Sequence, residues 1–156
     1  GDPAPEGGAV KLVIQRVSRA EVRVDGRVVG AIGCGMLLLV GLERGDGTSE
    51  VERAANKVAT LRIFSDENRR MNRDLAEVGG SVLAVSQFTL AGSIRKGRRP
   101  GFDGAMIGSE AEPLFDDFVR RLRALGVDVE TGSFGSMMDV ELVNDGPVTL
   151  IWQSGD

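Results

Sequence analysis

Strand patterns outnumber helix patterns in this chain, and that ratio limits its fold more than any other feature. About eight segments alternate in polarity or run continuously apolar, as strands do, whereas two follow helical spacing. Two helices cannot cover both faces of so much sheet. We therefore predict an α+β fold of curved, barrel-like, mostly antiparallel sheets with the two helices packed on one side, in three layers (β-β-α).

Turn signals divide the expected strands. Asp25-Gly26 is a strong hairpin signal between the alternating residues 20–25 and the returning residues 27–32. The dense turn sequence at residues 144–147 separates two further strands. Those two strands are expected at residues 140–143 and 148–153. The remaining strands are expected at residues 10–17, 36–42, 62–64 and 127–130 and within 79–90.

The two helical segments each begin with a serine followed three residues later by glutamate. Ser49 with Glu52, and Ser109 with Glu112, fit the capping box that marks a helix N-terminus. The first helix should run to about residue 61, and Gly126 should end the second. Their apolar stripes indicate core packing rather than a cofactor site.

The chain has no histidine and a single cysteine, Cys34. Catalysis by Ser-His-Asp or Cys-His groups in their usual forms is therefore excluded, and the commonest transition-metal ligand is missing. One cysteine cannot form an intramolecular disulfide, which fits a reducing cytoplasm. We expect no metal and no cofactor, so enzymatic chemistry must use backbone groups, hydroxyls, amides, carboxylates or the substrate itself.

Length and composition indicate one soluble domain. With 156 residues, 42% of them hydrophobic, the chain can bury a substantial core. We expect residues 10–156 to form this domain and the Pro- and Gly-rich residues 1–9 to be a disordered leader or a cloning remnant. No apolar run reaches the ~20 residues of a membrane helix, and no secretory signal is visible.

The most distinctive stretch is residues 79–90, an apolar strand pattern that ends in polar groups. Ser86, Gln87, Phe88 and Thr89 should lie together at the C-terminal end of this strand, a rigid place to mount chemistry. The alternative is that the two hydroxyls are ordinary strand-end residues that satisfy backbone groups. From this stretch alone the alternative is favoured.

A basic loop follows directly. Arg95, Lys96, Arg98 and Arg99 lie there without an acidic residue, although the chain as a whole has a net charge of -4. Any nucleic-acid contact must therefore depend on a local patch of this kind, with the loop as an arm that contacts phosphates. The alternative is a solvated basic loop without a partner.

Two segments together resemble the paired motifs of the D-aminoacyl-tRNA deacylases, also called D-tyrosyl-tRNA deacylases. They are Ser86-Gln87-Phe88-Thr89-Leu90 and Asn144-Asp145-Gly146-Pro147-Val148-Thr149. Similarity to that family's sequences also extends to residues 12–17, 62–65 and 71–72 and to the whole stretch 79–90. Each motif alone is weak, but their order and spacing from about residue 10 to 152 make the match strong.

The resemblance implies an enzyme that hydrolyses the ester between a D-amino acid and the 3′-terminal ribose of tRNA, a chiral proofreading step in translation. Glycine mischarged on tRNA-Ala is also implied as a substrate. The family is a cytoplasmic homodimer in which Gly146-Pro147 of one subunit, with a cis peptide bond, would reach the active site of the other. Arg16 matches the arginine that holds this motif. Carbonyl groups of Gly146 and Pro147 would exclude an L side chain by clash, whereas a hydrogen passes.

The resemblance also suggests a mechanism. Backbone N–H groups around Phe88 and Thr89 would stabilise the oxyanion, while Thr89 positions a water or acts as the nucleophile. No neighbouring base would activate this hydroxyl, so we favour activation of water by the ribose 2′-hydroxyl. Ser86 and Gln87 would hold the substrate's amino group or ribose.

The resemblance also implies a pocket for the base at the 3′ end of tRNA. Phe134 and Met138 fall where the family binds the terminal adenine of tRNA.

Two other functions stay open at this point. A related deacylase with a different preference among mischarged tRNAs would have another tetrapeptide in place of Ser-Gln-Phe-Thr. A non-catalytic RNA-binding or dimeric scaffold module is permitted by the lack of conventional catalytic residues. The few aromatic residues, most of which look like core, do not favour that second alternative.

Overall fold

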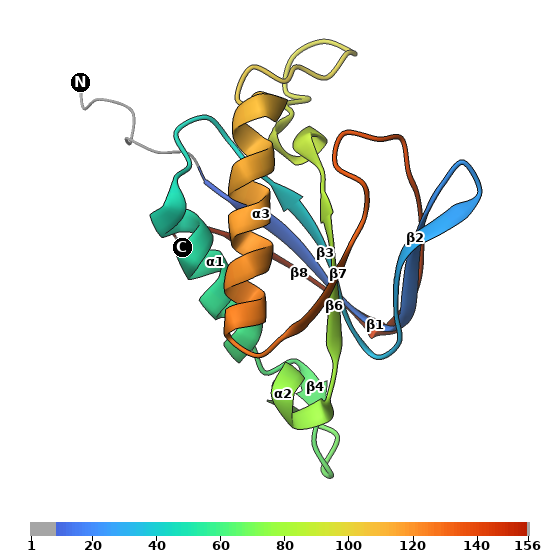
Figure 1. The fold of residues 1–156 in the computed structure, drawn as a ribbon. Helices are drawn as coiled ribbons and strands as arrows, with labels where there is room; N and C mark the ends of the chain where they lie inside the picture. Colours follow the sequence, from blue (N-terminus) through green and yellow to red (C-terminus); the bar gives the residue numbers. More distant parts are fainter. Residues whose placement is uncertain (1–8, 156) are drawn as a thin grey trace.

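The computed structural model describes residues 9–155 and contains a strongly curved mixed sheet flanked by two long helices (Figure 1). Of the leader predicted for residues 1–9, only Ala9 is described; its N–H donates to Glu43 Oε2 at 3.3 Å. The remainder of that prediction lies outside the described residues. The strands of the main sheet are β1 (Lys11–Val24), β2 (Arg27–Ile32), β3 (Gly35–Gly41), β6 (Ser81–Ser86), β7 (Asp128–Thr131) and β8 (Asp139–Gln153).

The long strand β1 organises the sheet. Strand β8 runs antiparallel along one of its edges, while β3 and then β2 pair antiparallel with successive halves of the other edge. Strands β6 and β7 continue beyond β3 in parallel, giving the order β2-β1-β3-β6-β7 with β8 attached to β1. The short hairpin β4 (Phe64–Ser65) and β5 (Met71–Arg73) forms a separate two-stranded sheet.

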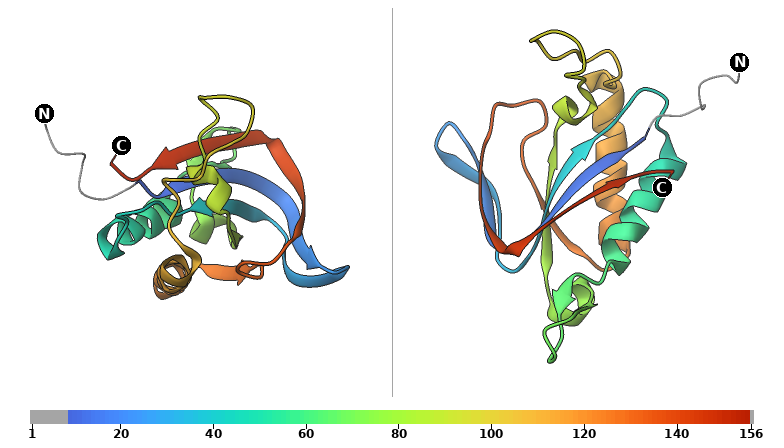
Figure 2. Two further views of the ribbon diagram at one scale, coloured as in Figure 1. Left: turned by 90° about the horizontal axis from the view of Figure 1, so that it is seen from above. Right: turned by 180° about the vertical axis from the view of Figure 1, so that it is seen from behind.

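The sheet curls until its two ends meet, as the view from above shows (Figure 2, left). Strand β2 approaches β7 so closely that a Cβ on Gly30 would overlap the carbonyl oxygen of Thr131. A glycine at this crossing therefore permits the near-closure of the sheet. The predicted curved, barrel-like α+β fold is confirmed.

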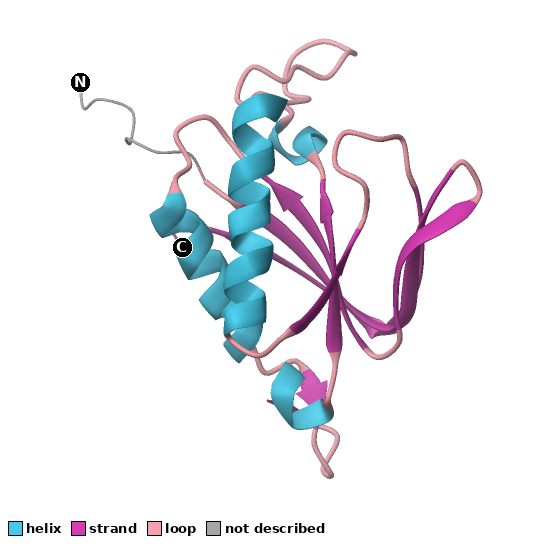
Figure 3. Cartoon of the chain, in the orientation of Figure 1, coloured by secondary structure: helices cyan, strands magenta, loops and turns pink. Residues whose placement is uncertain are grey.

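Two hydrophobic cores result from strand alternation. In β3, Met36 and Leu38 face the helices and join the larger core, whereas Leu37 faces the inside of the curl and joins a smaller one. The larger core lies between the sheet and the helices α1 (Thr48–Thr60) and α3 (Gly108–Ala124), which cover the same side of the sheet (Figure 3). A one-turn helix, α2 (Leu75–Val78), was not predicted. No helix of the described chain is long and apolar enough to span a membrane.

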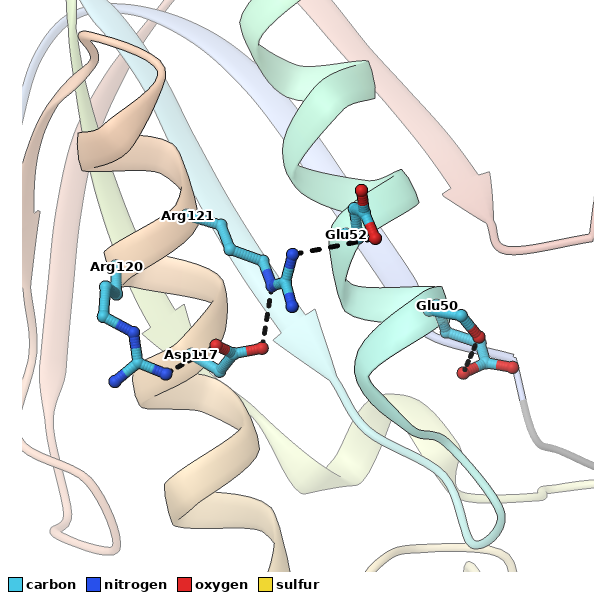
Figure 4. Close-up of polar contacts among 6 residues, drawn as sticks. Glu50, Glu52, Asp117, Arg120 and Arg121 are labelled. Atoms are coloured by element: carbon cyan, nitrogen blue, oxygen red, sulfur yellow. Dashed lines mark hydrogen bonds and ion pairs between the residues drawn. The ribbon is translucent and has the colours of Figure 1, made fainter.

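An ion-pair bridge connects the two long helices. Arg121 donates from Nε to Asp117 Oδ2 at 2.9 Å within α3, and its guanidinium lies 3.7 Å from Glu52 Oε2 on α1 (Figure 4). Arg120 also binds Asp117, at 2.6 Å. These arginines lower the pKa of the Asp117 carboxyl, the contact with Arg121 having the largest effect. The ion pair between α1 and α3 therefore joins the two helices outside the core.

Both predicted capping boxes were wrong in position. Helix α1 begins at Thr48, and its box is closed by Glu50, whose Oε2 accepts the Gly47 N–H at 2.9 Å. Helix α3 begins at Gly108 after Ile107, with no side-chain cap. In both cases the helix begins before the serine. The N-cap residues are Gly47 and Ile107, whose backbone is extended and whose carbonyls accept the first helical hydrogen bonds.

Two predicted strand boundaries were also wrong. Strand β1 is one element that contains residues 11–17 and 20–24 of the two predicted strands, and residues 140–143 and 148–153 belong to the single strand β8. The turn-like residues 144–147 are accommodated as a bulge, because Gln15 pairs with Thr149 and Val17 already pairs with Asn144. Residues 144–149 are called the bulge below.

Candidate active site

A pocket of about 570 Å³ opens where β6 ends. Its walls come from the 3-10 helix η1 (Phe88–Ala91), the start of α3 and the connection between β7 and β8. Among the predicted site residues, it brings together Ser86, Gln87, Phe88, Thr89, Phe134 and Met138.

Parallel pairing with β3 continues to Ser86, the last residue of β6, whereas pairing with β7 on the other side stops at Ala84. The Gln87 N–H donates to Val40 O at 2.8 Å, after which the chain turns into η1 rather than continuing as a strand. Gly41 permits that turn, because a Cβ there would lie 2.7 Å from Leu90 Cβ. Phe88 and Thr89 are therefore presented from a helical turn, not from the extended strand that the alternating pattern suggested.

Thr89 accepts a hydrogen bond in this turn. Gln87 donates from Nε2 to Thr89 Oγ1 at 2.9 Å, which leaves the proton of the hydroxyl free to be donated. The N–H groups of Phe88 and Thr89 donate to no atom of the described chain. Two consecutive lining residues thus have unengaged backbone donors, beside a hydroxyl that accepts a hydrogen bond from Gln87.

Ionisable groups are missing from this site. None of the described residues lining the pocket is Asp, Glu, Lys, Arg or Cys. The carboxyl with a large perturbation, Asp46, lies in the loop between β3 and α1 and is not part of the lining; burial raises its pKa to about 6. The described residues contain no cluster of acidic, histidine or cysteine side chains that could hold a metal ion. The polar groups that the lining residues contribute to the pocket are therefore hydroxyl, amide and backbone groups.

The far wall of the pocket is apolar. Phe134 packs against Phe115 of α3 with ring centroids 6.1 Å apart, and Met138 packs against the smaller core. Gly132 makes room for that methionine, since a Cβ there would lie 2.7 Å from Met138 Sδ. Ser133 and Ser136 bind one another across this turn at 2.8 Å. This wall can receive a flat, mainly apolar group.

Arg16, Gly146 and Pro147 do not line this pocket. Gly146 and Pro147 lie exposed on the β8 bulge, and the peptide bond between them is cis. Asn144 spans the bulge: its Oδ1 accepts the Val148 N–H at 2.6 Å, and its Nδ2 donates to Thr149 Oγ1 at 2.9 Å. Gly146 and Pro147 thus lie exposed on a bulge that the side chain of Asn144 stabilises.

Arg16 supports this bulge from β1. Its Nε donates to Asp145 O at 2.9 Å, and its Nη1 donates to Ile63 O at 2.7 Å, joining the bulge to the segment before β4. The side chain is only 11% exposed.

Several pocket residues were missed from the sequence. Met106, Gly108 and Ala111, at and just before the start of α3, and Met137 in the β7–β8 connection line the pocket beside the predicted residues. The Gly-, Ser- and Met-rich composition of residues 131–139 was a signal for Met137 alone, and the other three residues had none. The role of Asn144 as the brace of the bulge was missed because its sequence reads as a turn.

The comparisons with known proteins agree closely over most of the chain. The family model for D-Tyr-tRNA(Tyr) deacylase matches residues 13–153. A D-aminoacyl-tRNA deacylase of Thermomicrobium roseum is 59% identical over 147 residues, covering 94% of this chain and 96% of the relative. One of Symbiobacterium thermophilum is 57% identical over 145 residues, covering 93% and 96%.

Solved structures show the same fold. The c-Myc DNA unwinding element binding protein superposes with a TM-score of 0.85 at 37% identity, covering 91% of this chain and 97% of that one. A probable eukaryotic D-amino acid tRNA deacylase superposes with a TM-score of 0.80 at 19% identity, covering 94% and 100%.

Proposed function

The chain belongs to the D-Tyr-tRNA(Tyr) deacylase family, and on this premise we propose how its pocket hydrolyses the ester bond of D-aminoacyl-tRNA. The reaction adds water across the ester and releases free tRNA and the D-amino acid. The observation that carries the assignment of this reaction to the pocket is the pair of unengaged N–H groups of Phe88 and Thr89 in a cavity without ionisable side chains.

The two N–H groups stabilise the charge that develops on the ester carbonyl oxygen. Backbone donors of this kind are fixed before the reaction, so they cost no reorganisation in the transition state. An aminoacyl ester is already activated, and an oxyanion site supplies a large part of the remaining rate enhancement. This mechanism fits a pocket that has no base, because the ribose 2′-hydroxyl of the substrate activates the attacking water.

The other walls hold the two ends of the substrate. Phe134 and Met138 receive the terminal adenine, since they form the apolar wall opposite η1. Ser86 and Gln87 bind the amino group or the ribose with their side-chain oxygen atoms. The amide nitrogen of Gln87 also donates to the Thr89 hydroxyl, so the same side chain would contact both the substrate and Thr89.

The chiral filter is supplied by a second copy of the chain. Gly146 and Pro147 are exposed and do not line the pocket of their own subunit, so they are free to enter the pocket of a partner in a homodimer. There the two carbonyls form a wall that an L side chain meets and a hydrogen does not. Glycine mischarged on tRNA-Ala is then a substrate too. We place this reaction in the cytoplasm, where aminoacyl-tRNA is used.

The first experiment compares one tRNA charged with D-tyrosine with the same tRNA charged with L-tyrosine. We expect rapid hydrolysis of the D ester and none of the L ester above the spontaneous rate. Hydrolysis of neither would favour a non-catalytic RNA-binding or scaffold module. Hydrolysis of both would retain the ester chemistry but contradict the proposed filter.

Replacing Thr89 by alanine tests the role of its hydroxyl. We expect kcat to fall by less than about tenfold, because the backbone N–H of residue 89 remains and the hydroxyl has no base to make it a nucleophile. Thr89→Ser serves as the matched control, since it retains the hydroxyl that Gln87 binds. Loss of all turnover in Thr89→Ala with full activity in Thr89→Ser would instead indicate covalent catalysis, and a burst of released tRNA in the wild type would support that.

A further inference from the structure

An exposed aromatic pair lies at the mouth of the pocket. Phe88, which lines the pocket, meets Phe102 edge-to-face with ring centroids 5.3 Å apart at an interplanar angle of 67°. Their exposed fractions are 58% and 37%, although a globular chain usually buries phenylalanine. Phe102 does not line the pocket, so the pair extends the site outward from it.

Phe102 is held firmly in this position. Its ring packs on the backbone of Gly92, where a Cβ would lie 2.7 Å from the ring atom Cε1. Beside it, Ser93 and Gly101 exchange two backbone hydrogen bonds of 2.7 and 2.8 Å that close the base of the basic loop. The loop projects from the end of the molecule that carries η1 (Figure 1). The aromatic pair and the loop therefore share one anchored base.

The cations of this loop are unengaged. Arg95, Lys96, Arg98 and Arg99 are exposed, and none pairs with a carboxylate of the described chain. Apart from these four cations the sequence has 15 Lys and Arg (19 - 4) against 23 Asp and Glu, so the rest of the chain repels a polyanion. A phosphate backbone approaching the pocket is therefore attracted mainly here.

We propose that Phe102 stacks a base of the unpaired 3′ strand of tRNA, next to the terminal nucleotide, while the loop cations follow its phosphates. This inference rests on the proposed function, which places the terminal adenosine inside the pocket. Aromatic rings beside a basic track are how proteins hold single-stranded nucleic acid without reading its sequence. Sequence-tolerant stacking suits an end that all tRNAs share, and it adds binding energy outside the reacting centre.

The test compares two substrates that differ only in having this strand. D-tyrosyl-tRNA contains the nucleotides that precede the terminal adenosine, whereas the 3′-D-tyrosyl ester of adenosine does not. We expect Phe102→Leu to raise KM for D-tyrosyl-tRNA about tenfold with little change in kcat, and to leave kcat/KM for the adenosine ester unchanged. Phe102→Tyr, which retains the aromatic face, should behave as the wild type on both substrates.

Three outcomes overturn the inference. An equal loss on both substrates in Phe102→Leu would mean that Phe102 only holds Phe88 in place. An unchanged KM for D-tyrosyl-tRNA would mean that no base stacks on it. If the wild type cleaves neither ester, the proposed function itself fails, and the inference with it. In a supporting measurement, a short RNA with 2-aminopurine next to its terminal adenosine should lose fluorescence on binding the wild type and not on binding Phe102→Leu.

Discussion

Replacing Gly146 by alanine is expected to lower the preference for D over L substrates by about 100-fold. The φ of Gly146 is +141°, a region that L residues rarely adopt. The new Cβ would also lie 2.8 Å from Val148 Cγ2 and 3.2 Å from the Arg16 guanidinium. The bulge must therefore shift. Misplacing a group by about 1 Å can change a rate about 10²-fold, and we expect a change of this size in the rate for the L substrate relative to the D substrate.

The measurement is the ratio of hydrolysis rates for D-tyrosyl- and L-tyrosyl-tRNA. Gly33→Ala is the matched control, because no atom lies within 4 Å of a Cβ at that position and its φ is not positive. Thermal unfolding shows whether each variant is folded. An unchanged ratio in folded Gly146→Ala would contradict the proposed chiral filter, because a shift of Gly146 and Pro147 would then have no effect on selectivity.

The elements with strong periodicity could be predicted from the sequence. The apolar stripe of α1, with Val51 and Val58, and that of α3, with Phe118 and Leu122, are buried in the larger core as expected. The excess of strands over helices was enough to predict a curved sheet with helices on one side. Patterns that repeat within an element are local, so the sequence carries them without knowledge of the partner strands.

The long bent strands could not be predicted, for a physical reason. Asn144-Asp145-Gly146-Pro147 has the composition of a turn, and nothing in those residues shows that β1 pairs with β8 on both sides of it. The bulge depends on bonds between distant residues, such as that from Arg16 to Asp145 O. Likewise, whether Phe88 continues a strand or enters η1 depends on the space beside Gly41, which only the packed structure supplies.

The same limit applies to the candidate site. Ser86, Gln87, Phe88 and Thr89 are consecutive, so a single motif was enough to group them. Their neighbours across the pocket come from the start of α3 and the β7–β8 connection, and only the curl of the sheet brings these segments together. The pattern of a single sequence does not show which distant segments come into contact.

Removing the arginine that supports the bulge should have the second large effect. In Arg16→Ala, the carbonyls of Asp145 and Ile63 lose hydrogen bonds of 2.9 and 2.7 Å from a nearly buried guanidinium. Bonds to charged groups contribute about 1.5–3 kcal/mol each when they are shielded from water. Because the bond to Asp145 O is exposed and therefore weaker, we expect the free energy of unfolding to fall by about 2–4 kcal/mol in total. The preference for D over L substrates should fall with it, because the bulge then lacks the bond from Arg16 and retains the side-chain bonds of Asn144.

Two further variants separate support of the bulge from loss of charge. Arg16→Lys retains the charge, but a single ammonium cannot reproduce the two-sided geometry of guanidinium, so we expect an intermediate loss of stability and selectivity. Arg19→Ala, on the same strand, removes a side chain that is 54% exposed with an ion-pair distance of 3.7 Å to Glu141. It should change stability by less than about 0.5 kcal/mol. If Arg16→Ala loses stability but retains full selectivity, Asn144 alone positions the bulge, and the role of Arg16 is confined to joining β1 to the segment before β4.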